Sequence, residues 1–130
     1  MTMERHRLLV VDDDAATLAS LRELFTRAGF EVETATTGRE ALGRLLEREN
    51  PSAIVLDARM PVMSGEELVP VLRAYRRFSR IPVLLLTGFD DVRRTVTEAV
   101  ELVMRKPYRG DELVARVERL VGGGAAGAPA

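Results

Sequence analysis

Residues 8–14 read LLVVDDD, an apolar run that ends in three consecutive carboxylates. A continuous run of Leu and Val is typical of a β-strand that is buried on both faces. The run therefore predicts a central strand of a sheet covered on both sides, with acidic side chains at its carboxyl end. Like charges about 4 Å apart repel by roughly 4 kcal/mol at an effective dielectric constant of 20, so this cluster needs either solvent or a cation.

Four more apolar runs follow along the chain, and each is preceded by a segment with helical periodicity. The runs are FEVETA at 30–35, AIVLD at 53–57, IPVLLLT at 81–87 and LVMR at 102–105. Apolar residues in the intervening segments recur at helical spacing, as Leu18, Leu21 and Phe25 do. Because strands separated by helices cannot pair as hairpins, the pattern predicts a doubly wound α/β domain with a five-stranded parallel sheet.

Several residues predict where the helices begin and end. Asp14 is expected to cap the first helix, which should stop at Gly29. Thr37 and Glu40 have the spacing of a capping box at the start of the second helix. Pro70 lies inside the third helical segment, where a proline removes a backbone hydrogen bond. We therefore expect the third helix to be kinked or to begin late.

The composition indicates a single soluble domain in the cytoplasm. The 130 residues are 46% hydrophobic and 30% charged, with a formal net charge of -1, which gives no basic field for nucleic acid or a membrane surface. No cysteine is present, which excludes disulfides and thiolate metal sites, and no apolar run is long enough to cross a membrane. The composition predicts a domain at residues 1–121 and a flexible, Gly- and Ala-rich tail at residues 122–130.

Polar residues stand at the carboxyl ends of four predicted strands. They are Asp12 and Asp13 after the first strand, Asp57 after the third, Thr87 after the fourth and Lys106 after the fifth. Ligands of doubly wound sheets bind at this edge, and three carboxylates in an open site favour Mg²⁺ over Ca²⁺. Mg²⁺ and the lysine would together balance the three negative charges. A cation, an ammonium group and a hydroxyl around a carboxylate also suit phosphoryl transfer to that carboxylate.

Four stretches resemble, in their order along the chain, the receiver domain of two-component response regulators, the CheY-like family. The stretches are VVDDD at 10–14, IVLDARMPVMSGEEL at 54–68, IPVLLLTG at 81–88 and MRKPY at 104–108. The resemblance runs from about residue 7 to residue 121. It implies a flavodoxin-like sheet with the strand order 2-1-3-4-5.

The resemblance also implies a phosphoacceptor and a metal site. Asp57 would accept a phosphoryl group from the phosphohistidine of a histidine kinase. Asp13 would bind Mg²⁺ directly and Asp12 mainly through water, with Asp57 and the backbone carbonyl of Arg59 as further ligands. The domain would then carry out Mg²⁺-dependent self-phosphorylation at Asp57 and would lose the phosphoryl group slowly. It would not be an enzyme that turns over free substrates.

Thr87 and Lys106 would each contact an oxygen of the phosphoryl group, and the Lys106–Pro107 peptide bond would be cis. Two features differ from the usual receiver. Only 19 positions lead from Thr87 to Lys106, which is shorter by roughly one helical turn and predicts a shortened fourth helix. Val103 stands where receivers usually carry an aromatic ring that moves inward on activation. The usual aromatic signal is therefore not expected here.

Arg59 and Phe89 stand two positions beyond Asp57 and Thr87. The resemblance places at these two positions the groups that orient a water for attack on the phosphoryl group. Arginine offers only hydrogen-bond donors, and phenylalanine has no polar atom. We therefore expect the phosphoryl group to be lost slowly by comparison with receivers that carry an acid or an amide there.

Two other functions stay open at this stage. A pseudo-receiver would use the same fold as a docking module that is never phosphorylated. A small phosphatase would use Asp12 as its nucleophile, which leaves Asp57 without a role. For a receiver we expect protein partners: a sensor histidine kinase or phosphotransfer protein and an unknown effector, with a homodimer as a further option. We expect no contact with nucleic acid or a membrane, because no second domain fits after residue 121.

Overall fold

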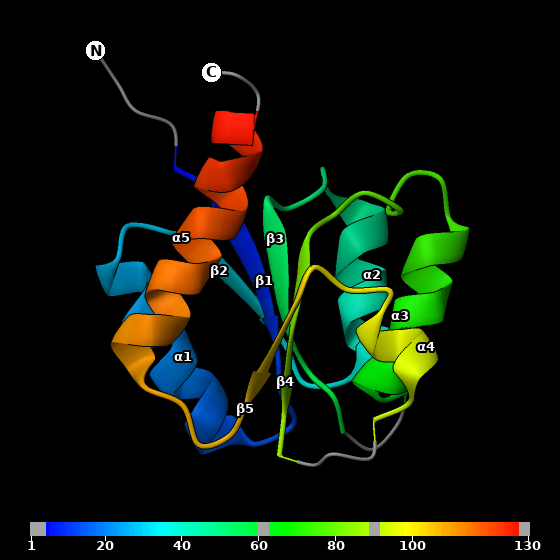
Figure 1. The fold of residues 1–130 in the computed structure, drawn as a ribbon, viewed down its shortest axis with the longest axis horizontal. Helices are drawn as coiled ribbons and strands as arrows, with labels where there is room; N and C mark the ends of the chain where they lie inside the picture. The colour runs from blue at the N-terminus through cyan, green and yellow to red at the C-terminus, as the bar shows by residue number, and fades with distance from the viewer. Residues whose placement is uncertain (1–4, 60–62, 89–91, 128–130) are drawn as a thin grey trace.

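The predicted strands form one parallel sheet in the order β2-β1-β3-β4-β5 (Figure 1). The computed structural model describes residues 5–59, 63–88 and 92–127. The strands are β1 (Arg7–Val11), β2 (Glu31–Ala35), β3 (Ala53–Asp57), β4 (Val83–Thr87) and β5 (Leu102–Arg105). The structure therefore confirms the doubly wound α/β fold and the strand order that the resemblance implies.

Helices cover both faces of the sheet. They are α1 (Ala15–Arg27), α2 (Gly38–Glu47), α3 (Gly65–Ala74), α4 (Arg94–Thr97) and α5 (Gly110–Gly127). α1 and α5 pack on one face, and α2, α3 and α4 pack on the other (Figure 1). Within β1, Val10 is buried beneath α1 and α5, whereas Leu9 is buried on the opposite face. Burial on both faces explains why the central strands read as unbroken apolar runs.

The helix caps follow the prediction only in part. Asp14 caps α1, because its Oδ2 accepts a hydrogen bond from the backbone N of the residue three positions on, at 2.9 Å. Gly29 follows α1 with a φ of 100°, a conformation that other residues rarely adopt. At α2, the Thr37 hydroxyl accepts from the backbone N of Glu40, but the Glu40 carboxylate accepts from the backbone N of Thr36. Only half of the predicted capping box is therefore present.

The bounds of α3 and α5 bear on two of the predictions. α3 begins at Gly65 and contains Pro70, and a capping box of Ser64 and Glu67 fixes its first turn, so the helix does not begin late and the alternative of a kink stays a prediction. α5 continues to Gly127, and the flexibility expected of residues 122–130 stays a prediction. A glycine costs about 1 kcal/mol in a helix but keeps its backbone hydrogen bond, so the glycines weaken α5 without ending it. Residues 128–130 lie outside the described residues.

α4 spans only four residues, which confirms the predicted shortening of the fourth helix. Arg73 of α3 contacts both the segment between α3 and β4 and the segment after α4. The guanidinium of Arg73 donates hydrogen bonds, at 2.7–3.1 Å, to the carbonyls of Ser79, Ile81 and Ala99 and to the side chain of Glu101. Glu101 also accepts from the backbone N of Val83 at 2.7 Å. These bonds fix the start of β4 relative to the entry into β5.

Among the described residues, no helix is both long enough and apolar enough to span a membrane.

Candidate functional site

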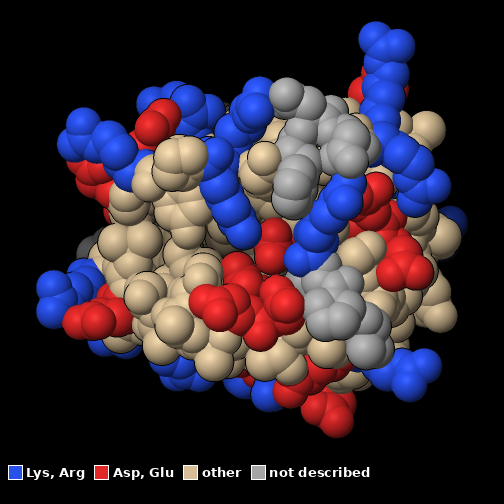
Figure 2. All heavy atoms as spheres, turned by 90° about the horizontal axis from the view of Figure 1, so that it is seen from below, with Lys and Arg blue, Asp and Glu red and all other residues tan. Residues whose placement is uncertain are grey.

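The carboxyl ends of β1 and β3 bring three carboxylates together. Asp12 and Asp13 directly follow β1, and Asp57 is the last residue of β3. One oxygen from each of these side chains lies within 4.8 Å of the other two. Figure 2 shows this end of the molecule, where acidic side chains gather near the centre and basic side chains lie around them. The fold therefore assembles the acidic cluster that the sequence predicts.

Asp12 is the buried member of the cluster, with 2% of its surface exposed. Its Oδ1 accepts a hydrogen bond from the backbone N of Asp14 at 2.9 Å, but its buried Oδ2 has no partner among the described residues. Burial raises the pKa of the Asp12 carboxyl, and the hydrogen bond from Asp14 opposes this shift. A divalent cation shared with Asp13 and Asp57 would satisfy the unpartnered oxygen. The residues present therefore fit the predicted Mg²⁺ site.

Asp57 faces Lys106, which is the only lysine in the sequence. The Nζ of Lys106 lies 3.2 Å from Oδ1 of Asp57. Burial raises the pKa of the Asp57 carboxyl, whereas the charge of Lys106 and a hydrogen bond from the backbone of Arg59 lower it. The ammonium group thus offsets part of the cost of a buried negative charge at the end of β3.

Thr87 ends β4, the strand that pairs with β3, and it is buried. Its carbonyl accepts a hydrogen bond from the backbone N of Lys106 at 2.8 Å, which places the lysine beside this strand end. The Lys106–Pro107 bond is cis, as the resemblance implies. All the predicted phosphoryl-transfer residues therefore lie along one edge of the sheet, and their catalytic roles stay predictions.

The remaining predicted positions have different surroundings. The side chain of Arg59 extends to Glu66 in α3, with 3.5 Å between Nε and Oε2, while its carbonyl stays a predicted metal ligand. Val103 packs, partly buried, against the apolar layer beneath α2 and α3. Phe89 lies outside the described residues, so the structure does not address the water-positioning role predicted for it.

Ser64, Gly65 and Glu67 fix the start of α3 beside the end of β3. A Cβ atom on Gly65 would lie 2.4 Å from the backbone oxygen of Asp57, so α3 begins against the end of β3 only because this residue is glycine. In the capping box, Ser64 Oγ accepts from the backbone N of Glu67 at 3.3 Å, and the Glu67 carboxylate accepts from the backbone N of Ser64 at 2.8 Å. The S-x-x-E spacing of Ser64 and Glu67 is typical of such a helix start.

We expect Asp12→Asn to stabilise the metal-free protein by about 1 kcal/mol near pH 7. Asparagine keeps the acceptor for the backbone N of Asp14 and removes a buried negative charge. Because the pKa of Asp12 is raised in the folded state, the wild type gains stability as it takes up a proton, so the difference should shrink as the pH falls. Urea unfolding in EDTA near pH 7 and at lower pH measures the effect. An Asp12→Asn variant less stable than wild type near pH 7 contradicts it.

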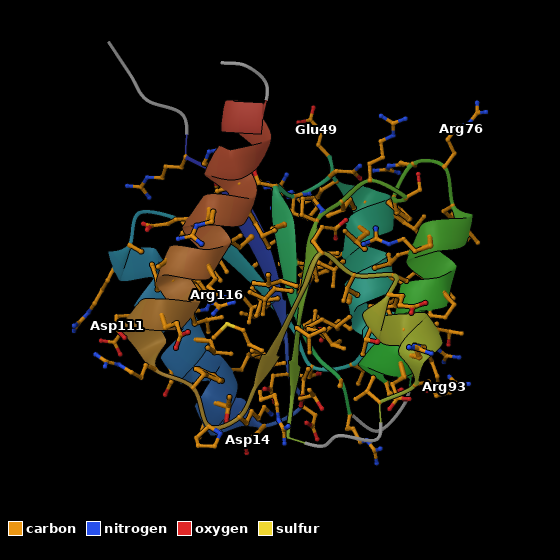
Figure 3. The ribbon with its side chains drawn as sticks, viewed as in Figure 1. Asp14, Glu49, Arg76, Arg93, Asp111 and Arg116 are labelled. Atoms are coloured by element: carbon orange, nitrogen blue, oxygen red, sulfur yellow. The ribbon has the colours of Figure 1, made fainter. Side chains whose placement is uncertain are left out.

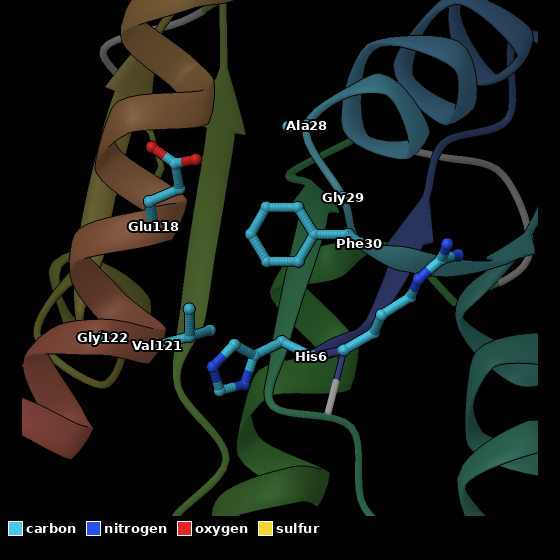
Figure 4. A pocket seen from close by; sticks show the side chains of 8 residues that line it. His6, Ala28, Gly29, Phe30, Glu118, Val121 and Gly122 are labelled. Atoms are coloured by element: carbon cyan, nitrogen blue, oxygen red, sulfur yellow. The ribbon is translucent and has the colours of Figure 1, made fainter. Parts of the chain in front are cut away.

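A separate cavity of about 410 Å³ lies at the opposite end of the sheet, beside α5 (Figure 4). Its lining includes His6, Phe30, Glu118 and Val121. His6 precedes β1 and Phe30 precedes β2, so the cavity is next to the amino ends of the strands, whereas the acidic cluster is at their carboxyl ends. The cavity therefore contains none of the predicted site residues.

Comparison with known proteins agrees with this fold. The family model described as the response regulator receiver domain matches residues 8–118. The transcriptional regulatory protein PrrA of Mycobacterium bovis is 42% identical over 118 residues, which cover 88% of this chain and 49% of PrrA. The chain thus spans about half the length of the curated relatives it matches.

Solved structures show the same architecture. The chemotaxis response regulator CheY4 of Vibrio cholerae has 29% sequence identity and a TM-score of 0.82, over 90% of this chain and 99% of CheY4. The response regulator TrrA from Thermotoga maritima, solved in complex with Mg²⁺-BeF, has 31% identity and a TM-score of 0.80, over 88% of this chain and 98% of TrrA. From the match of the family model and the strand order together, this chain belongs to the response regulator receiver domains of two-component systems.

Proposed function

We propose that this receiver domain accepts a phosphoryl group on Asp57 from the phosphohistidine of a histidine kinase or a phosphotransfer protein. The observation that carries the proposal is the 3.2 Å pair of Asp57 and Lys106 beside two further carboxylates. An acidic residue at a strand end is usually solvated. Asp57 is instead buried against an ammonium group, which is the environment that a reacting carboxylate needs.

The transfer follows from the chemistry of these groups. A carboxylate oxygen of Asp57 attacks the phosphorus, so an O–P bond forms while the N–P bond to the histidine breaks and its nitrogen leaves with the electron pair. Lys106 and the hydroxyl of Thr87 stabilise negative charge on the phosphoryl oxygens during the transfer. Water later hydrolyses the acyl phosphate slowly and restores Asp57. The domain acts only on itself and is not an enzyme for free substrates.

Mg²⁺, when bound, would supply positive charge between the carboxylates and the incoming phosphoryl oxygens. Asp13 would hold it directly and Asp12 mainly through water, with Asp57 and the carbonyl of Arg59 completing the protein ligands. The unpartnered Oδ2 of Asp12 supports this assignment, as does the Mg²⁺-BeF in the similar TrrA structure. The protein's own contribution is to hold these oxygens in place before the cation arrives.

The output would be protein contact in the cytoplasm. The proposed upstream partner is a sensor histidine kinase or a phosphotransfer protein, and the downstream partner is an effector protein. A homodimer is also compatible with this role. The domain itself is not proposed to bind nucleic acid or a membrane, since its net charge is -1. PrrA is named as a transcriptional regulatory protein, and this chain covers 49% of it.

We expect acetyl phosphate and Mg²⁺ to add a single phosphoryl group to the purified protein. Intact mass spectrometry measures the addition, and fragmentation of the labelled peptide should place it on Asp57. EDTA should prevent labelling, since the cation is part of the site. A pseudo-receiver would stay unlabelled under all conditions, and a phosphatase would release phosphate from free esters. Either result would contradict the proposed function.

A further inference from the structure

Glu66 lies between two arginines that come from different loops. Its Oε2 is 3.5 Å from Nε of Arg59, and its Oε1 is 3.7 Å from Nε of Arg93. Arg59 lies in the loop after β3, and Arg93 directly precedes α4 at the same end of the molecule as Asp14 (Figure 3). Strong charge-assisted hydrogen bonds measure about 2.7–2.9 Å, so both contacts are loose.

Arg59 is the member of this group that adjoins the phosphoacceptor. Its backbone makes a hydrogen bond to the Asp57 carboxylate, while 46% of its side chain is exposed. A cavity of about 390 Å³ lies next to it, lined by Arg59, Ser64, Glu66, Glu67 and Arg93. The guanidinium of Arg59 therefore has room to move while its backbone stays fixed beside Asp57.

Phosphorylation changes the charge of the site next to Arg59. Before transfer, Mg²⁺ and Lys106 balance the three carboxylates of Asp12, Asp13 and Asp57. After transfer, a phosphoryl group with about 1.5–2 negative charges replaces the single charge of Asp57. The site is then left with an excess of negative charge and with phosphoryl oxygens that accept strong hydrogen bonds from a guanidinium.

We propose that Glu66 is a positioning residue that holds Arg59 in the unphosphorylated domain and releases it to the phosphoryl group on Asp57. The inference rests on the proposed function and adds a step to it. Glu66, with 17% of its side chain exposed, keeps Arg93 as a partner after the exchange. The movement of Arg59 therefore leaves the Glu66 carboxylate paired in its half-buried position.

Arg59 on the phosphoryl group would slow hydrolysis. Its guanidinium carries only donors, so it cannot accept a proton from an attacking water, and it occupies space at the mouth of the site. Glu66 competes for the same guanidinium and so limits the protection. The sharing of Arg59 between the phosphoryl group and Glu66 thus affects the lifetime of the acyl phosphate.

Glu66→Gln tests this competition because it removes the charge and keeps the shape of the side chain. After removal of acetyl phosphate, the phosphorylated variant should decay roughly two- to fivefold more slowly than wild type, the size of effect that an exposed ion pair supports. Glu67→Gln is the matched control, since glutamine can still accept from the backbone N of Ser64, and it should decay at the wild-type rate. Arg59→Ala should decay faster, and adding Glu66→Gln to it should change nothing further.

Wild-type decay in Glu66→Gln, or equal slowing in the absence of Arg59, would overturn the inference while leaving phosphorylation of Asp57 intact. Absence of labelling in every variant would instead overturn the proposed function. The holding contact is also measurable without phosphorylation, by hydrogen exchange of the Arg59 Nε–H in NMR spectra. That proton should exchange faster in Glu66→Gln than in Glu67→Gln, and equal rates would show that Glu66 does not hold Arg59.

Discussion

Asp57→Asn should take up no phosphoryl group from acetyl phosphate, and Asp13→Ala should lose about 100-fold or more in labelling rate. Asparagine has no anionic oxygen that could form the acyl phosphate. Asp13 is the exposed member of the acidic cluster, and in the proposed function it binds the cation directly. A bound metal ion contributes several kcal/mol to such a transfer, and each 1.36 kcal/mol is about tenfold in rate.

Asp14→Ala is the matched control within the same triplet. The Asp14 carboxylate accepts from the backbone N of Thr17 at 2.9 Å and from its hydroxyl at 2.6 Å, bonds that lower the pKa of Asp14. Its loss should weaken the first turn of α1 and leave labelling almost unchanged. Initial rates at one Mg²⁺ concentration, followed by mass spectrometry, compare the variants. If Asp13→Ala and Asp14→Ala lose labelling equally, the division of roles within the triplet is wrong.

The second large effect concerns stability: Arg73→Ala should lower the free energy of unfolding by about 3 kcal/mol. With 19% of its side chain exposed, Arg73 donates hydrogen bonds to two carbonyls between α3 and β4, and to the Ala99 carbonyl and the Glu101 carboxylate after α4. Alanine would leave these partly buried acceptors to be satisfied by water or not at all. Glu101 would keep its bond to the backbone N of Val83, so β4 and β5 should still pair.

Arg76→Ala controls for the loss of an arginine near the end of α3. Arg76 is exposed and points outward from the end of the molecule opposite Arg93 (Figure 3). Its replacement should change stability by no more than about 0.5 kcal/mol, as is usual at surface positions. Urea unfolding of both variants measures the difference. Similar stabilities of Arg73→Ala and Arg76→Ala would mean that the hydrogen bonds of Arg73 do not hold the α4–β5 segment.

The sheet and the acidic cluster were predictable because both follow from short, local patterns in the sequence. An unbroken apolar run reports burial on both faces of a strand, and the carboxyl ends of parallel strands share one edge. The sequence therefore predicted that Asp12, Asp57 and Lys106 lie close together in the fold, although they are far apart in the chain. The shortening of α4 was equally visible, as a reduced spacing between Thr87 and Lys106.

The contacts of Arg73 and Glu66 were not predictable in the same way. Arg73 reaches the carbonyl of Ala99, and Glu66 reaches Arg93, only because α3 packs beside the segment around α4. The periodicity of apolar residues does not indicate which loop contacts which helix end. The end of α5 is hard to predict for a different reason, since glycines lower helix stability by increments and do not block the helix.

The solitary lysine has a practical consequence for anyone who attaches this domain to a surface or a dye. Acylating reagents will find the α-amino group and, as the sole side-chain amine, Lys106 beside Asp57. Coupling through amines would therefore neutralise the ammonium group beside Asp57, and under the proposed function the coupled protein would no longer accept a phosphoryl group. The sequence has no cysteine, so one engineered thiol far from this edge would carry a probe or tether and leave the ammonium group untouched.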